Sequence, residues 1–193
     1  MAHEHKGKSS ESLLDVNTIL QSLKIEPGQT ILDAGCGNGY MAKAFARLLD
    51  GTGVVYALDP DREAIDILRA ESAGTHIEAM EGDITTHTPI EASSVDLIYM
   101  STVFHGFSKE QIQGFRSEAK RLLKPHARLA IVEIQKRDTP FGPPMEIRFS
   151  PEELRHALPL APLATVDVGQ YFYMQMFENN TEGPTFSPSV QSA

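Results

Sequence analysis

The sequence predicts an α/β fold in which helices cover both faces of a largely parallel sheet. Five short apolar runs, each typical of a buried strand, alternate with helical patterns between residues 29 and 134. This alternation is typical of a doubly wound parallel sheet. Two later runs, 164–168 and 171–178, are separated by Gly169 and Gln170, which permit a hairpin. A terminal hairpin requires one antiparallel strand at one end of the sheet.

Composition narrows the class of protein. The 193 residues are 41% hydrophobic and 22% charged, which is typical of one soluble globular domain. No apolar run approaches the about 20 residues needed to span a bilayer, and the first residues lack the apolar centre of a secretory signal. The single cysteine, Cys36, excludes an internal disulfide and favours a reducing, cytoplasmic location. A net charge of −9 disfavours nucleic acid as a partner, which leaves a small-molecule substrate as the expectation.

The first elements follow from periodicity and turn residues. Residues 1–10 are polar, so we expect a flexible arm there; His3 and His5 lie in it and are not expected to bind a metal. Leucine, isoleucine and valine side chains at helical spacing predict an amphipathic helix over 11–23, which Pro27 and Gly28 separate from the first strand. The strands of the alternating region are expected at 29–34, 53–58, 75–80, 95–101 and 128–134. The helices between them are expected at 40–49, 61–73 and 109–123.

The later elements are marked by helix-start signals. Ser108 with Gln111 fits a capping box for the helix at 109–123. Residues 136–149 contain three prolines and a glycine and are expected to form an irregular loop. Ser150, followed by Pro151 and by Glu153 at the third position, predicts another helix start, with an end near Leu158. Residues 180–193 are expected to be disordered, so the domain should span 11–179.

A glycine-rich turn after the first strand is the most informative motif. Gly35, Gly37 and Gly39 follow the apolar residues Ile31 and Leu32 and open the helix at 40–49. Such a turn lets a ligand lie against bare backbone at the start of a helix. Twenty residues after the last glycine, Asp59 ends the second apolar run. A carboxylate at that place can accept both hydroxyls of a ribose, so we expect a nucleoside-containing cofactor.

Polar residues follow several strands of the predicted sheet. Asp59, Asp83 and Ser101 all fall where a strand is expected to end, as does the glycine turn. Because a doubly wound sheet binds its ligand at the carboxyl ends of the strands, these positions should meet at one crevice.

The spacing of the glycines limits the choice of cofactor. The dinucleotide fingerprint needs a glycine at the sixth position of the turn, where this chain has Tyr40. An NAD-dependent oxidoreductase is therefore disfavoured. The chain also lacks the Gly-x-x-x-x-Gly-Lys pattern of a phosphate-binding loop.

At this point the residues resemble class I S-adenosylmethionine-dependent methyltransferases, with closest similarity to the small bacterial branch that resembles ubiquinone and menaquinone biosynthesis methyltransferases. The resemblance covers residues 29 to 135, and its motifs occur in the family's order. They are Asp33-Ala-Gly-Cys-Gly-Asn-Gly39, Ala57-Leu-Asp-Pro60, Glu81-Gly-Asp-Ile84, Val95-Asp-Leu-Ile-Tyr-Met-Ser101 and Leu122-Leu-Lys-Pro125. The resemblance implies a Rossmann-like sheet of seven strands in the order 3-2-1-4-5-7-6, with strand 7 antiparallel.

The same resemblance implies a role for each matched residue. Gly35, Cys36, Gly37 and Gly39 would form the turn that presents backbone to the methionine end of S-adenosyl-L-methionine, and Asp33 would support that turn. Asp59 would accept the ribose hydroxyls. The remaining contacts implied are those of Pro60, Asp83 and Ile84 with the adenine and of Ser101 with the methionine amino group. One departure is His126 and Ala127, where the family has two glycines.

Methyl transfer to oxygen or nitrogen can need a base. His105 follows the fourth strand and titrates in the useful range, so it is the candidate general base. A role as a residue that merely lines the pocket stays open for it. Aromatic residues that could wall an acceptor pocket are Tyr40, Phe104, Phe107, Tyr171 and Tyr173.

Two functions stay open at the level of sequence. The first is methyl transfer from S-adenosylmethionine to a small molecule by in-line displacement. The second is a non-catalytic module that binds the same cofactor as a sensor or regulatory subunit. The acceptor and the oligomeric state are not encoded in any motif of the sequence.

Overall fold

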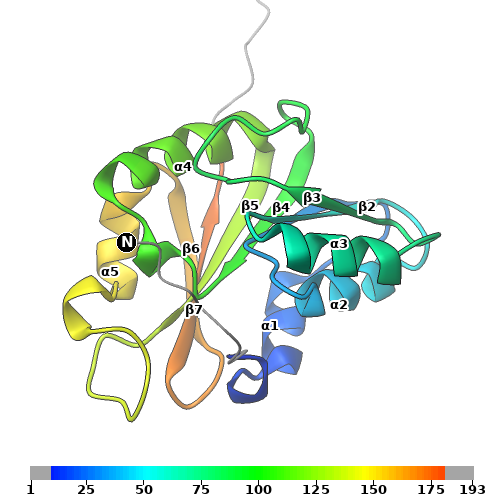
Figure 1. The fold of residues 1–193 in the computed structure, drawn as a ribbon. Helices are drawn as coiled ribbons and strands as arrows, with labels where there is room; N and C mark the ends of the chain where they lie inside the picture. Colours follow the sequence, from blue (N-terminus) through cyan, green and yellow to red (C-terminus); the bar gives the residue numbers. More distant parts are fainter. Residues whose placement is uncertain (1–9, 181–193) are drawn as a thin grey trace, which may run out of the picture.

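The computed structural model describes residues 10–180 and contains one mixed sheet in the strand order β3-β2-β1-β4-β5-β7-β6 (Figure 1). The strands are β1 (Thr30–Ala34), β2 (Val54–Asp59), β3 (Ile77–Glu81), β4 (Val95–Ser101), β5 (Leu123–Ile134), β6 (Ala161–Asp167) and β7 (Phe172–Glu178). The pairs among β1 to β5 are parallel, whereas β7 runs antiparallel to β5 and β6. The predicted fold class and strand order are therefore confirmed.

Five α-helices and three short 3₁₀ segments connect the strands of the described chain. They are η1 (Ser10–Leu13), α1 (Val16–Leu23), α2 (Tyr40–Leu48), α3 (Arg62–Glu71), η2 (Phe104–Gly106), α4 (Lys109–Leu122), η3 (Met145–Ile147) and α5 (Pro151–Ala157). Both predicted capping boxes are present, at Ser108 with Gln111 and at Ser150 with Glu153. None of the helices within residues 10–180 is long and apolar enough to cross a membrane.

The sequence prediction of one helix over 11–23 is wrong at its start. The Asp15 side chain accepts a hydrogen bond from the Thr18 amide at 3.0 Å and therefore caps a new helix, α1. The Asp15 amide in turn donates to the Val168 carbonyl at 2.8 Å, which ties this point to the end of the hairpin. An acid within an apolar helical pattern thus marks a helix start.

The predicted start of the fifth strand is also wrong. The strand begins at Leu123 rather than at 128 because Leu123 already pairs with Val95 of β4, before a register shift that leads to the pair of Arg128 with Leu97. His126 donates its amide to the Asn179 carbonyl and adopts φ +63°. This is the left-handed conformation that two glycines would adopt more easily. The departure seen in the sequence therefore lies at the amino end of β5.

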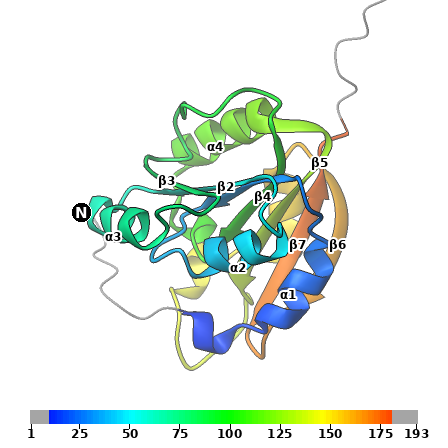
Figure 2. The same ribbon diagram turned by 90° about the vertical axis from the view of Figure 1, so that its right-hand side faces the viewer.

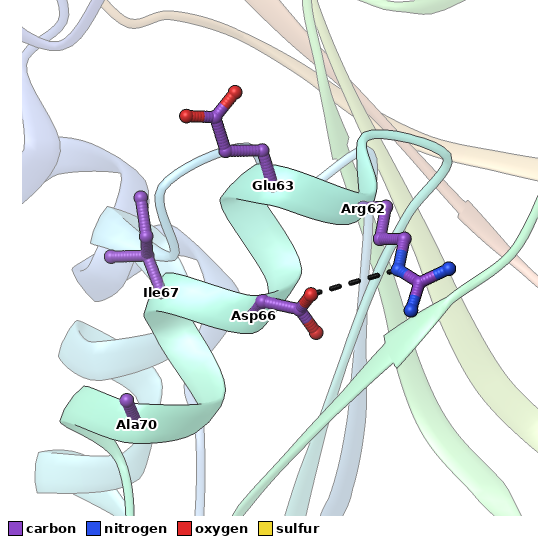
Figure 3. A pocket seen from close by; sticks show the side chains of 5 residues that line it. All are labelled: Arg62, Glu63, Asp66, Ile67 and Ala70. Atoms are coloured by element: carbon purple, nitrogen blue, oxygen red, sulfur yellow. Dashed lines mark ion pairs between the residues drawn. The ribbon is translucent and has the colours of Figure 1, made fainter.

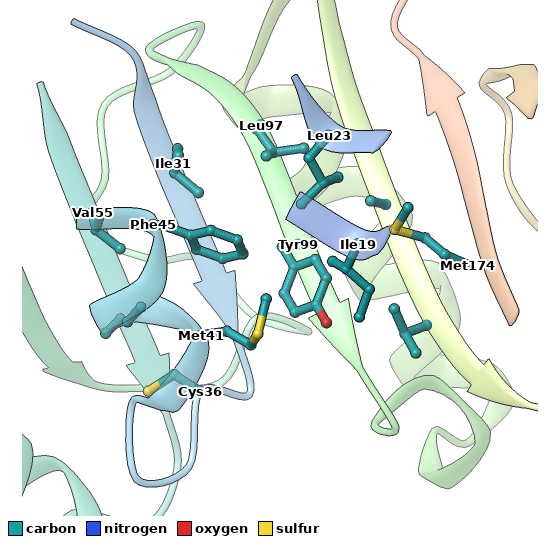
Figure 4. Close-up of a cluster of buried hydrophobic side chains, with 14 of the residues drawn as sticks. Ile19, Leu23, Ile31, Cys36, Met41, Phe45, Val55, Leu97, Tyr99 and Met174 are labelled. Carbon is teal, nitrogen blue, oxygen red and sulfur yellow. The ribbon is translucent and has the colours of Figure 1, made fainter. Parts of the chain in front are cut away.

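The sheet separates two apolar layers. Figure 2 shows α4 on one side of the sheet and α1, α2 and α3 on the other. The first layer packs around Phe45 and Tyr99, whose rings make an edge-to-face contact at 5.2 Å between centroids (Figure 4). The second layer packs around Phe104 and Phe115. With both faces covered, Asp33, Asp59 and Ser101 lie at or next to the carboxyl ends of β1, β2 and β4.

The predictions for the two ends of the chain are not tested, because most of these residues lie outside the described part of the structure. The flexible arm expected at 1–10, with His3 and His5, falls almost wholly outside the described residues. The disordered tail expected at 180–193 lies outside them too, apart from its first residue.

Candidate functional site

The predicted polar residues meet at the carboxyl edge of β1, β2 and β4. Asp33 pairs in register with Ala57 of β2 and with Tyr99 of β4, so these three strands place their ends side by side. Across the same edge, the Gly37 amide donates to Asp59 Oδ2 at 2.8 Å. The glycine turn and the acid twenty residues after its last glycine thus form one direct contact, as their spacing suggests.

The backbone of the glycine turn approaches its neighbours closely. Gly35 adopts φ +80°, and a Cβ there would lie 2.5 Å from Cγ2 of Val103. The amides of Gly35 and Cys36 both donate to the Leu58 carbonyl, at 2.8 and 3.1 Å. These amides are therefore engaged, and the turn offers a ligand its carbonyl oxygens and bare glycine surface. Gly37, by contrast, has no atom within 4 Å of an added Cβ and borders open space.

Two acids are held in position by backbone donors. Asp59 Oδ1 accepts from the Asp61 amide at 2.9 Å, in addition to the contact of Oδ2 with Gly37. Asp83 Oδ1 accepts from the Thr85 amide at 2.8 Å. Both acids are half-buried, and Pro60 beside Asp59 is exposed, whereas Ile84 beside Asp83 is buried. Because each carboxylate oxygen can accept more than one hydrogen bond, both acids can still bind a ligand.

Three buried polar atoms near this edge have no hydrogen-bond partner within the described residues. They are Asp33 Oδ2, the Tyr99 hydroxyl and Ser101 Oγ. Figure 4 shows the Tyr99 hydroxyl pointing toward the carboxyl end of β4. Burying such groups without partners costs about 1–3 kcal/mol each, so a cluster of them indicates a binding site for a polar ligand.

The electrostatics of this edge favour a cation. Burial raises the pKa of Asp33 to about 7, and the nearby charge of Asp59 adds to the effect. Neither acid forms an ion pair with a lysine or arginine in the part of the chain that the structure describes. A positively charged ligand would supply the missing compensation and favour ionised Asp33.

Cys36 is a packing residue of the turn. Its side chain is buried, and burial together with Asp33 and Asp59 raises the pKa of the thiol far above its ordinary value. A nucleophilic cysteine requires the opposite shift, because the thiolate is the reactive form. Cys36 therefore contributes shape rather than covalent chemistry.

The segment 101–107 runs from the glycine turn of this cleft to a second hollow. Thr102 adopts φ +56° and donates its amide to the Val132 carbonyl at 2.8 Å, which turns the chain sharply after β4. Val103 then packs against the glycine turn, as its contact with the Gly35 position indicates. Two residues later, His105 lines the second hollow. One short segment thus forms part of the wall on both sides.

A cavity of about 280 Å³ lies beside His105, between the first turns of α4 and α5. Its apolar lining consists of Phe107, Ile112, Ile147 and Phe149. Its charged lining consists of Lys109, Lys136, Glu146, Arg148 and Glu153. We define these residues, with His105, as the acceptor cavity. Half of the lining residues are charged, so the acceptor cavity offers a small molecule both apolar surface and charged groups.

His105 is held by a buried carboxylate that the sequence reading missed. Its Nδ1 lies 2.7 Å from Glu133 Oε2, and its amide donates to Glu133 Oε1 at 3.2 Å. Glu133 is fully buried on β5, and the His105 side chain is 11% exposed. The only sequence signal was an acid within the apolar run 129–134.

Arg148 fixes the loop that closes the acceptor cavity. Its guanidinium is buried and donates to the carbonyls of Pro143, Gln135, Arg137 and Phe141 and to the Thr139 hydroxyl, at 2.8 to 3.2 Å. The predicted irregular loop 136–149 is therefore held as one ordered unit, and nothing in its local sequence marked Arg148 for this role.

The five aromatic residues expected around the acceptor lie in different environments. Phe107 lines the acceptor cavity, and Tyr40 is 42% exposed at the start of α2. Phe104 is fully buried in the core, and Tyr173 is buried with its hydroxyl bonded to the Phe149 carbonyl at 2.6 Å. Tyr171 packs edge-to-face on Phe141. The structure therefore brings only Phe107 of this group to the cavity beside His105.

A further hollow lies on the outer face of α3, lined by Arg62, Glu63, Asp66, Ile67 and Ala70 (Figure 3). All five residues come from one helix, and Arg62 pairs with Asp66 at 3.6 Å. Because no buried polar group faces this surface among its lining residues, the cleft at the strand ends is the stronger candidate.

The known proteins to which this chain is similar include several that are named as methyltransferases. Residues 31–126 match the family described as a methyltransferase domain. Over 130 residues the chain is 28% identical to an uncharacterized methyltransferase of Synechocystis, covering 66% of this chain and 58% of that protein. Over 115 residues it is 29% identical to the 2-phytyl-1,4-naphtoquinone methyltransferase of Trichormus variabilis, covering 58% and 49%. The match thus spans about half the length of these relatives.

A solved structure is similar over nearly the whole chain. The crystal structure of a SAM dependent methyltransferase from Aquifex aeolicus superposes with a TM-score of 0.79 and 27% identity, covering 90% of this chain and 94% of that one.

Proposed function

Because this chain belongs to the S-adenosylmethionine-dependent methyltransferase family, we propose that it binds S-adenosyl-L-methionine at the carboxyl edge of β1, β2 and β4 and transfers a methyl group to a small molecule. The single observation that carries the proposal is the group of three unpartnered buried atoms, on Asp33, Tyr99 and Ser101, beside the glycine turn. When bound, the cofactor supplies an electrophilic methyl on a sulfonium centre.

The residues at this edge fit the cofactor. Asp59 would accept the ribose hydroxyls, while Asp83, with Ile84 and Pro60 beside the two acids, would hold the adenine. Ser101 and the carbonyl oxygens of the turn around Gly35 would receive the methionine end. The positive charges of the cofactor match a cleft with two acids that lack a cationic partner.

The acceptor is proposed to bind in the acceptor cavity, which adjoins the cofactor cleft at segment 101–107. Holding two reactants in line can lower the activation barrier by about 7–11 kcal/mol, so orientation alone supplies much of the catalysis. The apolar walls formed by Phe107 and Phe149 suit a small ring or chain. One relative is named for a naphthoquinone, an apolar small molecule whose ring carries neither an O–H nor an N–H group.

His105 is proposed as the base for this transfer, since it lines the acceptor cavity. The cytoplasmic location expected from the single cysteine remains part of the proposal.

Calorimetric titration tests cofactor binding. We expect S-adenosylmethionine and its demethylated product to bind with dissociation constants in the micromolar range and NAD not to bind. The matched variant is Gly35→Ala, whose Cβ would collide with Val103 and should abolish binding. Preferential binding of NAD, or equal binding by Gly35→Ala, would contradict the proposed site.

A second assay separates an enzyme from a binding module. The protein is incubated with cofactor labelled at the methyl group and with a small-molecule extract, and label transfer is followed by mass spectrometry. Transfer to a compound of low mass supports the proposal. Tight cofactor binding without transfer to any fraction would favour the sensor.

A further inference from the structure

We propose that Glu133 is a positioning residue that holds His105 as a proton acceptor facing the acceptor cavity, so that methyl transfer goes to an oxygen or nitrogen that carries a dissociable proton. This inference rests on the proposed function and narrows its substrate class. It is carried by the contact between two side chains that lie 28 residues apart in the chain.

Both oxygens of Glu133 are directed at one residue. Oε2 lies 2.7 Å from His105 Nδ1, and Oε1 accepts from the His105 amide at 3.2 Å. The carboxyl group is fully buried, and the structure gives it no lysine or arginine partner within residues 10–180. Burying a carboxyl group costs free energy unless the group is hydrogen-bonded. The contacts with His105 offset this cost for Glu133.

This contact determines which ring nitrogen can accept a proton. Where the Glu133 carboxylate is ionised it can only accept hydrogen bonds, so the hydrogen of the 2.7 Å contact then belongs to Nδ1 of His105. The proton of a neutral imidazole is then on Nδ1, and Nε2 is left as the acceptor. Within the described residues Nε2 has no hydrogen-bond partner, and the His105 side chain lines the acceptor cavity.

The charged and titratable groups around the pair come from five further parts of the chain. They are Lys109 of α4, Lys136 after β5, Glu146 and Arg148 around η3, Glu153 of α5 and Tyr173 of β7. Lys136 and Glu153 neutralise each other at 2.6 Å, and Arg148 is directed at loop carbonyls. Burial, and then the charge of Glu133, raise the pKa of Tyr173, whose hydroxyl donates to the Phe149 carbonyl instead. Glu133 is therefore the group bonded to His105.

The proposed step balances without a further reactant. The acceptor's O–H or N–H bond breaks and its proton goes to Nε2 of His105. The freed electron pair forms the bond to the methyl carbon, while the pair of the carbon–sulfur bond stays on sulfur. His105 then returns the proton to water. A carbon acceptor without an acidic proton would give His105 and Glu133 no proton to remove.

The chain contains a matched control for this pair. His126 Nδ1 lies 2.8 Å from Glu178 Oε1 at the opposite edge of the sheet. The His126 side chain is 71% exposed there, so water competes for both ring nitrogens. Because the contact of His126 with Glu178 is neither buried nor next to a cavity, it should not hold the His126 ring in a single tautomer.

Nitrogen-15 NMR of the imidazole rings at pH 8 tests the proposal without an acceptor. For His105 we expect a neutral ring with hydrogen on Nδ1, and for His126 a mixture of both tautomers in exchange. Glu133→Leu removes the acceptor and should transfer the hydrogen of His105 largely to Nε2, whereas Glu178→Leu should leave His105 unchanged. A doubly protonated His105 at this pH, or hydrogen on Nε2 in the wild type, would overturn the proposal.

Kinetics of transfer from the labelled cofactor to the small-molecule extract provide a second readout. Glu133→Gln should lower the transfer rate by about 10–100-fold and change its pH profile, because a wrong tautomer removes the base. Glu133→Asp should restore part of the rate. Cofactor affinity should stay within threefold in both variants. An unchanged pH profile in Glu133→Gln would contradict the inference and leave the proposed function in place, whereas failure of the wild type to bind the cofactor would contradict the proposed function itself.

Discussion

The cofactor cleft and the acceptor cavity adjoin one segment of chain, yet they are built in different ways. In the cleft, backbone amides hold the acids, as the Gly37 amide does with Asp59. In the cavity, side chains far apart in sequence hold one another, as Glu133 does with His105 and Tyr173 does with the Phe149 carbonyl. In the cleft, the backbone conformation restricts which residue types can occupy each position. In the cavity, two contacting side chains can be substituted together, so the lining can differ from one protein to another. The first region should therefore determine the cofactor, and the second the acceptor.

The largest expected effect concerns Asp33 in the cleft. Burial raises its pKa from 3.8 to about 7, so the folded chain retains a proton that the unfolded chain releases between about pH 4 and pH 7. The free energy of unfolding should therefore fall as pH rises through this window, by up to about 4 kcal/mol. Denaturant titrations of the protein without cofactor measure this slope. Asp33→Asn should flatten it, and an equal slope in that variant would refute the assignment.

A second large effect is expected from the cavity loop. Arg148→Met leaves the carbonyls of loop 136–149 without their shared donor and should lower the free energy of unfolding by about 3 kcal/mol. Cofactor affinity should stay within threefold, because the loop belongs to the other region. Arg137→Met is the matched variant, since Arg137 is exposed and donates to the Gln170 carbonyl, which lies outside this loop. A large loss of cofactor affinity in Arg148→Met would break the division between the two regions.

Asp59 should affect the cleft alone. Asp59→Asn removes the charge that binds the Gly37 amide and that is proposed to bind the ribose. We expect the cofactor dissociation constant to rise by about 10–100-fold, equivalent to about 1.5–3 kcal/mol for a hydrogen bond to a charged group. Calorimetry gives the constant, and NMR should show His105 unchanged. Affinity equal to that of the wild type would remove Asp59 from the site.

The smallest effect is expected on the outer face of α3. Asp66→Asn disrupts the exposed pairs with Arg62 and Arg69 and should change the free energy of unfolding by less than about 0.5 kcal/mol. Neither cofactor affinity nor methyl transfer should change. A clear change in either would mean that the hollow in Figure 3 takes part in function.

The sequence predicted those parts of the molecule that local pattern determines. Both capping boxes, at Ser108 and Ser150, are confirmed, because caps act over a few residues. The strand order is also confirmed, but the family resemblance implied it rather than local pattern. The roles of Asp59, Asp83 and Ser101 toward a ligand stay predictions. Glu133 and Arg148 were missed, since their partners are chosen by tertiary packing rather than by neighbours in sequence.

The most direct test of the whole account is a crystal structure with the demethylated cofactor bound. We expect the ribose to contact Asp59 and the methionine end to cover the unpartnered atoms of Asp33 and Ser101. We expect the sulfur to face the side of segment 101–107 where His105 lies. A cofactor bound elsewhere, or one whose sulfur points away from the acceptor cavity, would contradict it.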